Sequence, residues 1–267
     1  MRLYQNIAFD LDDTLLDTSG ALIPAAARRA VSALLAAKYD FNESQNVPSN
    51  EVEFLLKQRS SLLKTDPRSD IWLSLAHQAL SLISTSPSPH PRSIDTVLLA
   101  QVARDAFFKH PLETLPDEAI RLTSGAREIL EWSHSRANIH LVTSGDATTQ
   151  NKKIDRLGIR DFFTSVQCVE ARASAKDGIG AKQVAFQSIA NTYENDTLPP
   201  LSIGNRVDTD LGEAKLIGWK TAWIRHGEHA ALVPQKPWEI PDFEVSSPAE
   251  LLSLWKQQFS DQDLPQR

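Results

Sequence analysis

The sequence predicts an α/β fold in which a Rossmann-like parallel sheet carries an inserted all-helical domain. Two observations lead to this fold class. Through most of the chain, short apolar runs alternate with helical patterns, and this alternation is typical of parallel sheets with helical crossovers. After the first apolar run, however, residues 18–115 contain amphipathic helical patterns and no convincing strand.

The predicted strands are short runs without strict alternation of apolar and polar residues. Such runs are typical of strands that are buried on both faces of a sheet. A run at residues 162–169 is weaker, and DFEV at residues 242–245 is a late candidate. The clear runs are NIAFDL (6–11), NIHLVT (138–143), LSIGN (201–205) and KTAWI (220–224).

Helical patterns separate and follow these runs. They lie at residues 126–136, 181–193, 209–218 and 247–259. The third ends on Gly218, as a helix with a C-terminal glycine cap would. The fourth starts with Ser247 as N-cap and Pro248 at the first helical position. Strands that alternate with such helices imply right-handed crossovers and a parallel sheet.

Residues 18–115 are predicted to form a helical cap domain inserted into the sheet domain. Polar or Pro/Ser-rich loops at residues 41–50 and 84–93 separate the helical patterns. The patterns lie at residues 25–38, 51–64, 70–83 and 94–109. We therefore expect residues 1–17 and 116–267 to form an α/β core that carries this cap.

The composition is ordinary for a globular protein and argues against several classes of function. Of the 267 residues, 41% are hydrophobic and 23% are charged, and the net charge of −6 argues against a nucleic-acid surface. Cys168 is the only cysteine, so neither an intrachain disulfide nor a thiolate zinc site is expected. No run approaches the roughly 20 apolar residues of a membrane span. We therefore expect a cytoplasmic monomer or homodimer that binds neither nucleic acid nor membrane.

Polar side chains follow three of the predicted strands. They are Asp10 and Asp12 at the end of the first run, Thr143 and Ser144 followed by Gly145 at the end of the second, and Asn205, Asp208 and Asp210 at and after the end of the third. Ligands of open parallel sheets bind outside the carboxyl ends of the strands. Four or more oxygen ligands at one edge favour a hard cation, and Mg²⁺ is the natural candidate.

Three segments in this order resemble motifs of the haloacid dehalogenase superfamily. FDLDDTL (9–15) resembles the first motif, LVTSG (141–145) the second, and IGNRVDTDLGEAKLIGWKTAWI (203–224) the fourth. The resemblance covers the whole chain outside the predicted cap. It implies a core of this superfamily, of the phosphatase type, with a helical cap inserted between the first and second motifs.

The resemblance also implies catalytic roles. Asp10 would be the nucleophile, which attacks phosphorus to form an aspartyl-phosphate. Asp12 would protonate the leaving group and then activate water, and the neighbouring carboxylate and phosphate should favour its protonated form. In this superfamily the backbone carbonyl of the second acid, rather than its side chain, binds Mg²⁺.

Substrate and metal residues follow from the same motifs. Thr143 and the backbone N–H groups of Ser144 and Gly145 would hold the phosphoryl oxygens, and Thr14 is a further substrate-binding candidate. The candidate metal ligands are Asp10, Asp12, Asn205, Asp210 and, as the alternative at this spacing, Asp208.

Two positions depart from the family pattern or leave it open. Asn205 stands where the fourth motif has an aspartate, so the metal site loses one negative charge. The lysine of the third motif, which should touch both nucleophile and phosphate, is either Lys182 or Lys176. Lys182 is favoured because it begins a good helix, whereas Lys176 keeps the usual distance from the preceding strand.

The function that we expect is Mg²⁺-dependent hydrolysis of a small phosphorylated metabolite through an aspartyl-phosphate. A phosphomutase would use the same residues. A haloacid dehalogenase would use the same nucleophile on carbon, but such enzymes generally lack the second acid. A non-catalytic binding protein of the same fold is the alternative from another class, and Asn205 is the feature that allows it.

Overall fold

The computed structural model describes residues 4–39, 47–82, 95–108, 112, 120–170, 179–193 and 198–258. The chain divides into two compact units, and each is described by itself. One contains residues 1–21 and 112–267, and the other contains residues 22–111. The loop predicted at residues 84–93 and the candidate Lys176 lie outside the described residues.

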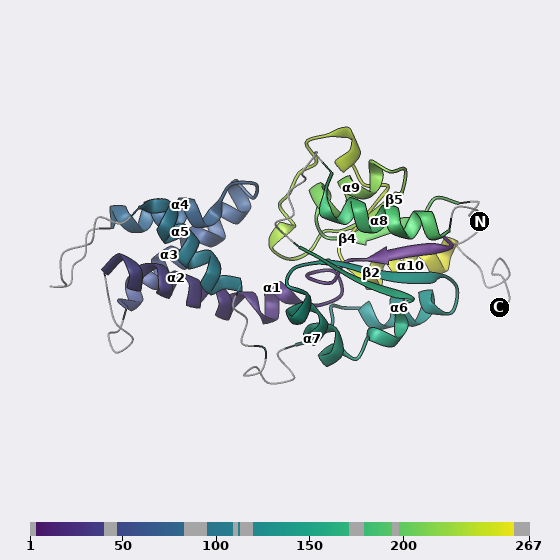
Figure 1. Ribbon diagram of the computed structural model, residues 1–267, viewed down its shortest axis with the longest axis horizontal. Coiled ribbons are helices and arrows are strands. Elements are labelled where there is room, and N and C mark those ends of the chain that lie inside the picture. The colour runs from purple at the N-terminus through teal and green to yellow at the C-terminus, as the bar shows by residue number, and fades with distance from the viewer. Residues whose placement is uncertain are drawn as a thin grey trace. The chain divides into compact units, whose positions relative to one another are not determined.

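A six-stranded sheet in the order β3-β2-β1-β4-β5-β6 forms the centre of the first unit (Figure 1). Its strands are β1 (Asn6–Phe9), β2 (Asn138–Ser144), β3 (Ser165–Val169), β4 (Leu201–Gly204), β5 (Lys220–Ile224) and β6 (Phe243–Val245). Neighbouring strands pair in parallel throughout. Because β1 pairs with β2 on one side and β4 on the other, Asp10 lies between the ends of those strands. The predicted α/β fold class is confirmed.

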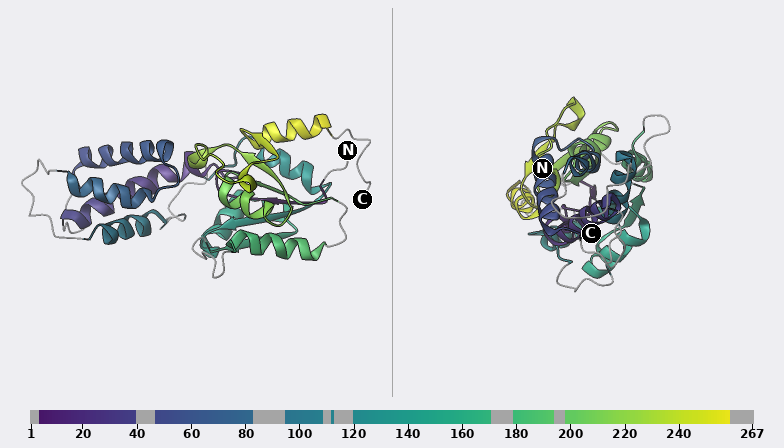
Figure 2. Two further views of the ribbon diagram at one scale, coloured as in Figure 1. Left: turned by 90° about the horizontal axis from the view of Figure 1, so that it is seen from above. Right: turned by 90° about the vertical axis from the view of Figure 1, so that its left-hand side faces the viewer.

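Helices cover both faces of this sheet. They are α6 (Ala126–His134), α7 (Ala147–Leu157), α8 (Ala181–Thr192), α9 (Gly212–Lys215) and α10 (Pro248–Gln258). The one-turn α1 (Thr18–Ala21) precedes the helical unit in the sequence. Figure 2 shows α6 and α10 on one face and α8 on the other. Trp132 and Trp255 join α6 to α10, with ring centroids 5.6 Å apart. Phe186 of α8 packs on Trp219 at 5.0 Å, in an apolar cluster with Ala8 and Val142 of the sheet.

The segment after β4 differs from the regular helix predicted at residues 209–218. It forms a π-helical turn, Val207–Leu211, which leads into the short α9. The N–H groups of Asp210 and Leu211 both donate to the Arg206 carbonyl, at 3.0 and 3.3 Å. The Asp210 carboxylate turns back to accept from the Arg206 N–H at 2.9 Å. The extra residue in this turn therefore directs Asp210 back towards the end of β4.

The weak strand predicted at residues 162–169 is shorter than expected. Residues Arg160–Phe162 form a 3₁₀ turn, and β3 begins at Ser165. The N–H of Phe163 donates to the Arg160 carbonyl at 3.1 Å, as in a turn rather than a strand. The Phe162 ring packs edge-on against His134 at 5.9 Å. These aromatic residues therefore cover α6 instead of extending the sheet.

The described residues of the second unit form helices. Its helices are α2 (Ile23–Tyr39), α3 (Ser49–Thr65), α4 (Ile71–Ser81) and α5 (Thr96–Phe108). Their apolar faces share one buried cluster, in which Trp72 of α4 contacts Phe107 of α5 at 5.1 Å. Asp70 caps α4 by accepting from the Leu73 N–H at 3.1 Å. Among the described residues, no helix has the length and apolarity needed to cross a membrane.

Candidate active site

Asp10 stands at the carboxyl end of the central strand. Its N–H donates to the Ile203 carbonyl of β4 at 2.8 Å, so the backbone at Asp10 continues the sheet and is held rigidly. The carboxylate is nearly buried, with 8% of the residue exposed. Thr14, four residues later and fully buried, donates to Asp10 Oδ2 over a long 3.3 Å. Thr14 therefore contacts the candidate nucleophile directly.

Lys182 joins Asp10 to Asp210. Its Nζ is 2.6 Å from Asp10 Oδ1 and 2.6 Å from Asp210 Oδ1. Lys182 is 4% and Asp210 2% exposed. Gly204 makes room for this cluster, because a Cβ there would stand 2.3 Å from Asp210 Oδ2. The carboxylate that follows β1, a carboxylate of the turn after β4 and the ammonium of α8 therefore converge at one edge of the sheet.

The electrostatics of this cluster follow from its burial. Burial raises the pKa of Asp10 to about 7, although Lys182 lowers it, and Asp210 and Asp12 add to the rise. Burial alone would lower the pKa of the Lys182 ammonium, but Asp10 and Asp210 outweigh burial and raise it. Lys182 therefore stays charged and compensates the two acids.

The other fourth-motif residues have different surroundings. Asn205 is buried, and its backbone carbonyl accepts from Trp223 Nε1 at 3.0 Å. Asp208 is engaged by Arg206, whose guanidinium reaches both carboxylate oxygens, at 3.1 and 2.7 Å. Burial would raise the pKa of Asp208, but Arg206 lowers it. Asp210 thus shares the Lys182 ammonium with Asp10, whereas Asp208 is engaged by Arg206.

Asp12 accepts three side-chain hydrogen bonds. Thr18 Oγ1 and Lys153 Nζ both donate to Oδ1, at 2.6 and 2.8 Å, and Gln150 Nε2 donates to Oδ2 at 2.8 Å. Burial tends to raise the pKa of Asp12, but Lys153, Thr18 and Gln150 together lower it. The structure without substrate therefore favours the ionised carboxylate, whereas the sequence led us to expect the protonated form. Lys153 is the reason, because its charge opposes that of the neighbouring acid.

The second motif supplies one buried hydroxyl. Thr143 is fully buried at the end of β2, and its Oγ1 accepts from Gln150 Nε2 at 2.6 Å. The Ser144 carbonyl also accepts from Gln150, at 3.2 Å. The Gly145 N–H donates to the Val169 carbonyl of β3 at 2.9 Å. That N–H, expected to bind a phosphoryl oxygen, is thus engaged within the sheet.

Gln150 and Lys153 were missed by the sequence reasoning. Both belong to α7, whose sequence ATTQNKKIDRL is polar, and which was not predicted as a helix. Both are buried, because they face Asp12 rather than solvent. The one available signal was their spacing of three residues, which places two side chains on one face of a helix.

Comparison with known proteins identifies the family. The family model for haloacid dehalogenase-like hydrolases matches residues 4–195. The chain belongs to the haloacid dehalogenase-like hydrolases. A curated relative of this hydrolase is the glyceraldehyde 3-phosphate phosphatase of Methanopyrus kandleri, 27% identical over 255 residues, which cover 96% of this chain and 98% of the relative. Another is human N-acylneuraminate-9-phosphatase, 23% identical over 93% of this chain and 92% of the relative.

Solved structures of other members share the fold of this hydrolase. The HAD-hydrolase YfnB from Bacillus subtilis, in a magnesium-bound form, has a TM-score of 0.58 and 20% identity, covering 95% of this chain and 99% of that one. A HAD phosphatase from Thermococcus onnurineus has a TM-score of 0.51 and 18% identity, covering 95% and 97%. At these identities the similarity supports the fold alone.

The donor set of the hydrolase site suits a hard divalent cation. Asp10 and Asp210 contact the same ammonium nitrogen, so their carboxylates lie close together. Two further oxygen donors are close in sequence. They are the backbone carbonyl of Asp12, two residues after Asp10, and the side chain of Asn205, five residues before Asp210. Oxygen ligands are what Mg²⁺ prefers. The residues present therefore fit the metal that the sequence predicted.

A second group of metal-ligand side chains lies beside this site. Ligand atoms of Asp13, Asp17 and His226 are within 4.8 Å of one another. Both oxygens of Asp13, however, accept from Ser19, through its N–H and its Oγ, at 2.6 Å each. Asp17 accepts from the Gly20 N–H at 2.9 Å and from Arg121 at 2.7 Å. Because these oxygens accept hydrogen bonds from Ser19 and Gly20, the group stabilises the position of α1.

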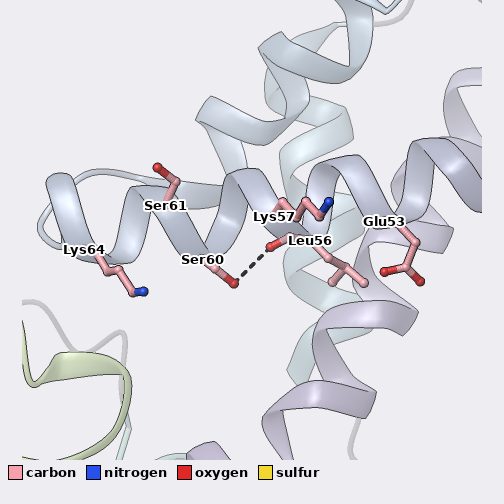
Figure 3. Close-up of a pocket in the computed structure, with 6 residues that line it drawn as sticks. All are labelled: Glu53, Leu56, Lys57, Ser60, Ser61 and Lys64. Atoms are coloured by element: carbon pink, nitrogen blue, oxygen red, sulfur yellow. Dashed lines mark hydrogen bonds between the residues drawn. The ribbon is translucent and has the colours of Figure 1, made fainter.

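The helical unit has a surface hollow of a different character (Figure 3). All residues that line it come from α3: Glu53, Leu56, Lys57, Ser60, Ser61 and Lys64. Ser60 Oγ donates to the Leu56 carbonyl one turn earlier, at 3.1 Å. A hollow along one helix, with no convergence of groups from several elements, lacks the geometry of a catalytic site.

Proposed function

We propose that this hydrolase is a phosphatase that transfers the phosphoryl group of a small phosphorylated metabolite to Asp10 and then to water. The observation that carries the proposal is the buried Asp10–Lys182–Asp210 cluster, with Asp12 two residues after Asp10 beyond the end of β1. The names of the archaeal and human relatives, both phosphatases of small phosphorylated metabolites, support this substrate class.

The residues of this chain divide the reaction between them. Lys182 holds Asp10 Oδ1, so Oδ2, which receives only the long bond from Thr14 among the described contacts, is the oxygen that attacks phosphorus. The Thr143 hydroxyl and the Ser144 N–H bind phosphoryl oxygens. The Lys182 ammonium stabilises the negative charge that develops on the transferring group. Asp12 gives a proton to the leaving oxygen and later removes one from water.

The metal of the proposal is Mg²⁺. Asp10, Asn205 and Asp210 would hold it through their side chains and Asp12 through its backbone carbonyl. A bound divalent cation supplies charge neutralisation at the phosphoryl oxygens. Because Asn205 brings no charge, we expect the site to bind Mg²⁺ more weakly than one with an aspartate there. Asp208 stays outside the proposed set, because Arg206 engages both its oxygens.

The helical unit is proposed to act as a cap that covers the substrate and selects it. This role rests on the place of the unit in the chain, between the segment with Asp10 and the segment with Thr143. The same arrangement permits a phosphomutase, which differs only in the acceptor of the phosphoryl group.

The test is phosphate release from p-nitrophenyl phosphate and from a panel of phosphorylated metabolites, with and without Mg²⁺. Asp10→Asn should abolish release, while Asp161→Asn, an exposed acid of the Arg160–Phe162 turn, should leave it unchanged. Activity that survives Asp10→Asn would contradict the mechanism. Halide release from 2-chloropropionate would instead favour a dehalogenase, and transfer to a second substrate hydroxyl a mutase.

A further inference from the structure

Helix α7 presents two buried donors to Asp12. Asp146 begins the helix by accepting from the Thr149 N–H at 2.8 Å, directly after β2. Gln150 and Lys153 follow three residues apart and therefore share a face. Because α7 starts at the end of the strand that carries Thr143, the helix is fixed relative to the phosphoryl-binding residue.

Lys153 determines which oxygen of Asp12 is occupied. The residue is 4% exposed, and its ammonium donates to Oδ1 at 2.8 Å. Thr18 Oγ1 donates to the same oxygen at 2.6 Å. A carboxylate oxygen offers about two lone-pair positions. Oδ1 is therefore fully engaged, and the proton exchanged during the reaction has to sit on Oδ2.

Gln150 links Asp12 to Thr143. Its Nε2 is 2.8 Å from Asp12 Oδ2 and 2.6 Å from Thr143 Oγ1. An ionised carboxylate only accepts, so the amide nitrogen is the end that must face it. The Thr143 hydroxyl, which accepts from this amide, keeps its own hydrogen to donate to a phosphoryl oxygen. One side chain thus orients both the proposed acid and the proposed phosphoryl ligand.

We propose that Gln150 and Lys153 are positioning residues that hold the Asp12 carboxylate with Oδ2 directed at the leaving-group oxygen. The inference rests on the proposed phosphatase function. The substrate binds as the phosphate monoanion and gives its proton to Asp12 Oδ2. In the first step the Asp10–phosphorus bond forms, the ester bond to phosphorus breaks, and the proton on Oδ2 passes to the departing oxygen. In the second step water attacks phosphorus, its proton passes to Oδ2, and the Asp10–phosphorus bond breaks.

A lysine and a glutamine that only stabilised the fold would affect all substrates equally. A positioned acid matters most for a basic leaving group, because a good leaving group departs without a proton. Phenyl phosphate and p-nitrophenyl phosphate are similar in shape and differ mainly in the basicity of the departing phenolate. Their ratio of kcat/KM reports the first step alone and does not depend on the fraction of folded enzyme.

The experiment measures this ratio in the full chain with Mg²⁺, for wild type, Lys153→Met, Gln150→Leu and Lys153→Arg. Lys152→Met is the matched control, since Lys152 is the exposed neighbour on the same helix. For Lys153→Met and Gln150→Leu, kcat/KM for phenyl phosphate should fall at least about fivefold more than for p-nitrophenyl phosphate. Lys153→Arg should recover most of the ratio, and Lys152→Met should keep the wild-type value.

The outcomes separate this inference from the function on which it rests. If wild type hydrolyses both esters and Asp10→Asn does not, the proposed function stands. An unchanged ratio in Lys153→Met and Gln150→Leu would then overturn the positioning role alone, whatever the loss of total activity. If wild type releases no phosphate from either ester or from the metabolite panel, the function fails and the inference falls with it.

Discussion

Lys182 in the sheet unit and Lys38 in the helical unit are almost equally buried, with 4% and 2% of each residue exposed. Their surroundings are opposite. Lys182 contacts two carboxylates at 2.6 Å, whereas Lys38 contacts the Tyr39 hydroxyl at 2.8 Å and the Leu82 carbonyl at 3.1 Å. Among the described residues, Lys38 pairs with Glu51 at 3.9 Å, and Tyr39 donates to the same carboxylate.

The difference separates an ammonium that is proposed to act in catalysis from one that stabilises the contacts between helices. Burial lowers the pKa of Lys38, and Glu51 opposes it only in part, while two acids raise the pKa of Lys182. Lys38 joins the end of α2 to the start of α3 and the residue after α4. Lys182 instead gathers acids that would otherwise repel each other. A buried lysine that contacts two carboxylates, such as Lys182, is a stronger indication of a functional site than one that contacts neutral oxygens, such as Lys38.

The largest effect is expected at Lys182. Lys182→Met should reduce kcat/KM for p-nitrophenyl phosphate by about 10³-fold or more, because the developing phosphoryl charge loses its ammonium partner. Lys38→Met should leave kcat/KM within about twofold, if its role is structural. Steady-state kinetics on both variants, with circular dichroism as the check of folding, makes the comparison. Comparable losses of activity in the two variants would remove the distinction.

A third buried base, His140, has its ring nitrogens in hydrogen bonds with Ser165 and Asn6 rather than with an acid. His140 of β2 lies between Asn6 and Ser165, and burial lowers its pKa to about 4. The folded pKa lies below the unfolded value of about 6.5. Below pH 6.5 the unfolded state therefore takes up a proton that the buried imidazole does not. The free energy of unfolding should fall as the pH drops from about 6.5 towards 4, by up to about 3 kcal/mol.

Urea unfolding of wild type and His140→Gln at pH 7.5 and 4.5 measures this loss. The destabilisation on acidification should be smaller in the variant. His77→Gln, a control at an exposed histidine of α4, should match wild type. Equal acid sensitivity in His140→Gln and wild type would show that burial without an acid does not keep this imidazole neutral.

A smaller effect on stability is expected at Lys38. Lys38→Met removes donors from the Tyr39 hydroxyl and the Leu82 carbonyl and leaves Glu51 buried with less compensation. The free energy of unfolding should fall by about 2 kcal/mol. Lys57→Met, on the exposed face of α3 shown in Figure 3, should change it by less than about 0.5 kcal/mol. Urea titration followed by circular dichroism gives both values. An unchanged free energy of unfolding in Lys38→Met would mean that the Tyr39–Glu51 hydrogen bond stabilises this region without the lysine.

The smallest effect sharpens the account of the Lys182 cluster. Asn205→Asp adds a third carboxylate beside Asp10 and Asp210 and should strengthen Mg²⁺ binding by about tenfold, or about 1.4 kcal/mol. Calorimetric titration with Mg²⁺ measures the affinity directly, and half-activation of phosphate release gives a second estimate. Weaker Mg²⁺ binding in Asn205→Asp would mean that the positive charge of Lys182 cannot offset the repulsion among three carboxylates.

Local patterns were sufficient to predict the sheet and the acids at its edge. The run NIAFDL is apolar up to Phe9 and ends in Asp10, so strand and candidate nucleophile are visible together. The sequence favoured Lys182 but left Lys176 open, because it does not show how far the segment before α8 reaches. In the structure Lys182 contacts Asp10, and Lys176 lies outside the described residues.

What the sequence did not reveal depends on tertiary contacts. Gln150 and Lys153 lie in a polar helix that reads as solvated, and they are buried only because Asp12 lies over its first turns. The lowered pKa of Asp12 was missed for the same reason. The π-helical turn directs Asp210 because its hydrogen-bonded residues are separated by one residue more than in an α-helix. The pattern of apolar residues in the sequence does not reveal this extra residue.

The central claim is that Asp10 accepts the phosphoryl group. Mixing the enzyme with Mg²⁺ and a substrate from the panel, quenching in acid within one turnover and sequencing the peptides by mass spectrometry tests it most directly. The account predicts one phosphoryl group on Asp10, formed no later than the first product alcohol and labile to hydroxylamine. Full release of the alcohol, with unmodified Asp10 at every quench time and undiminished activity in Asp10→Asn, would contradict it.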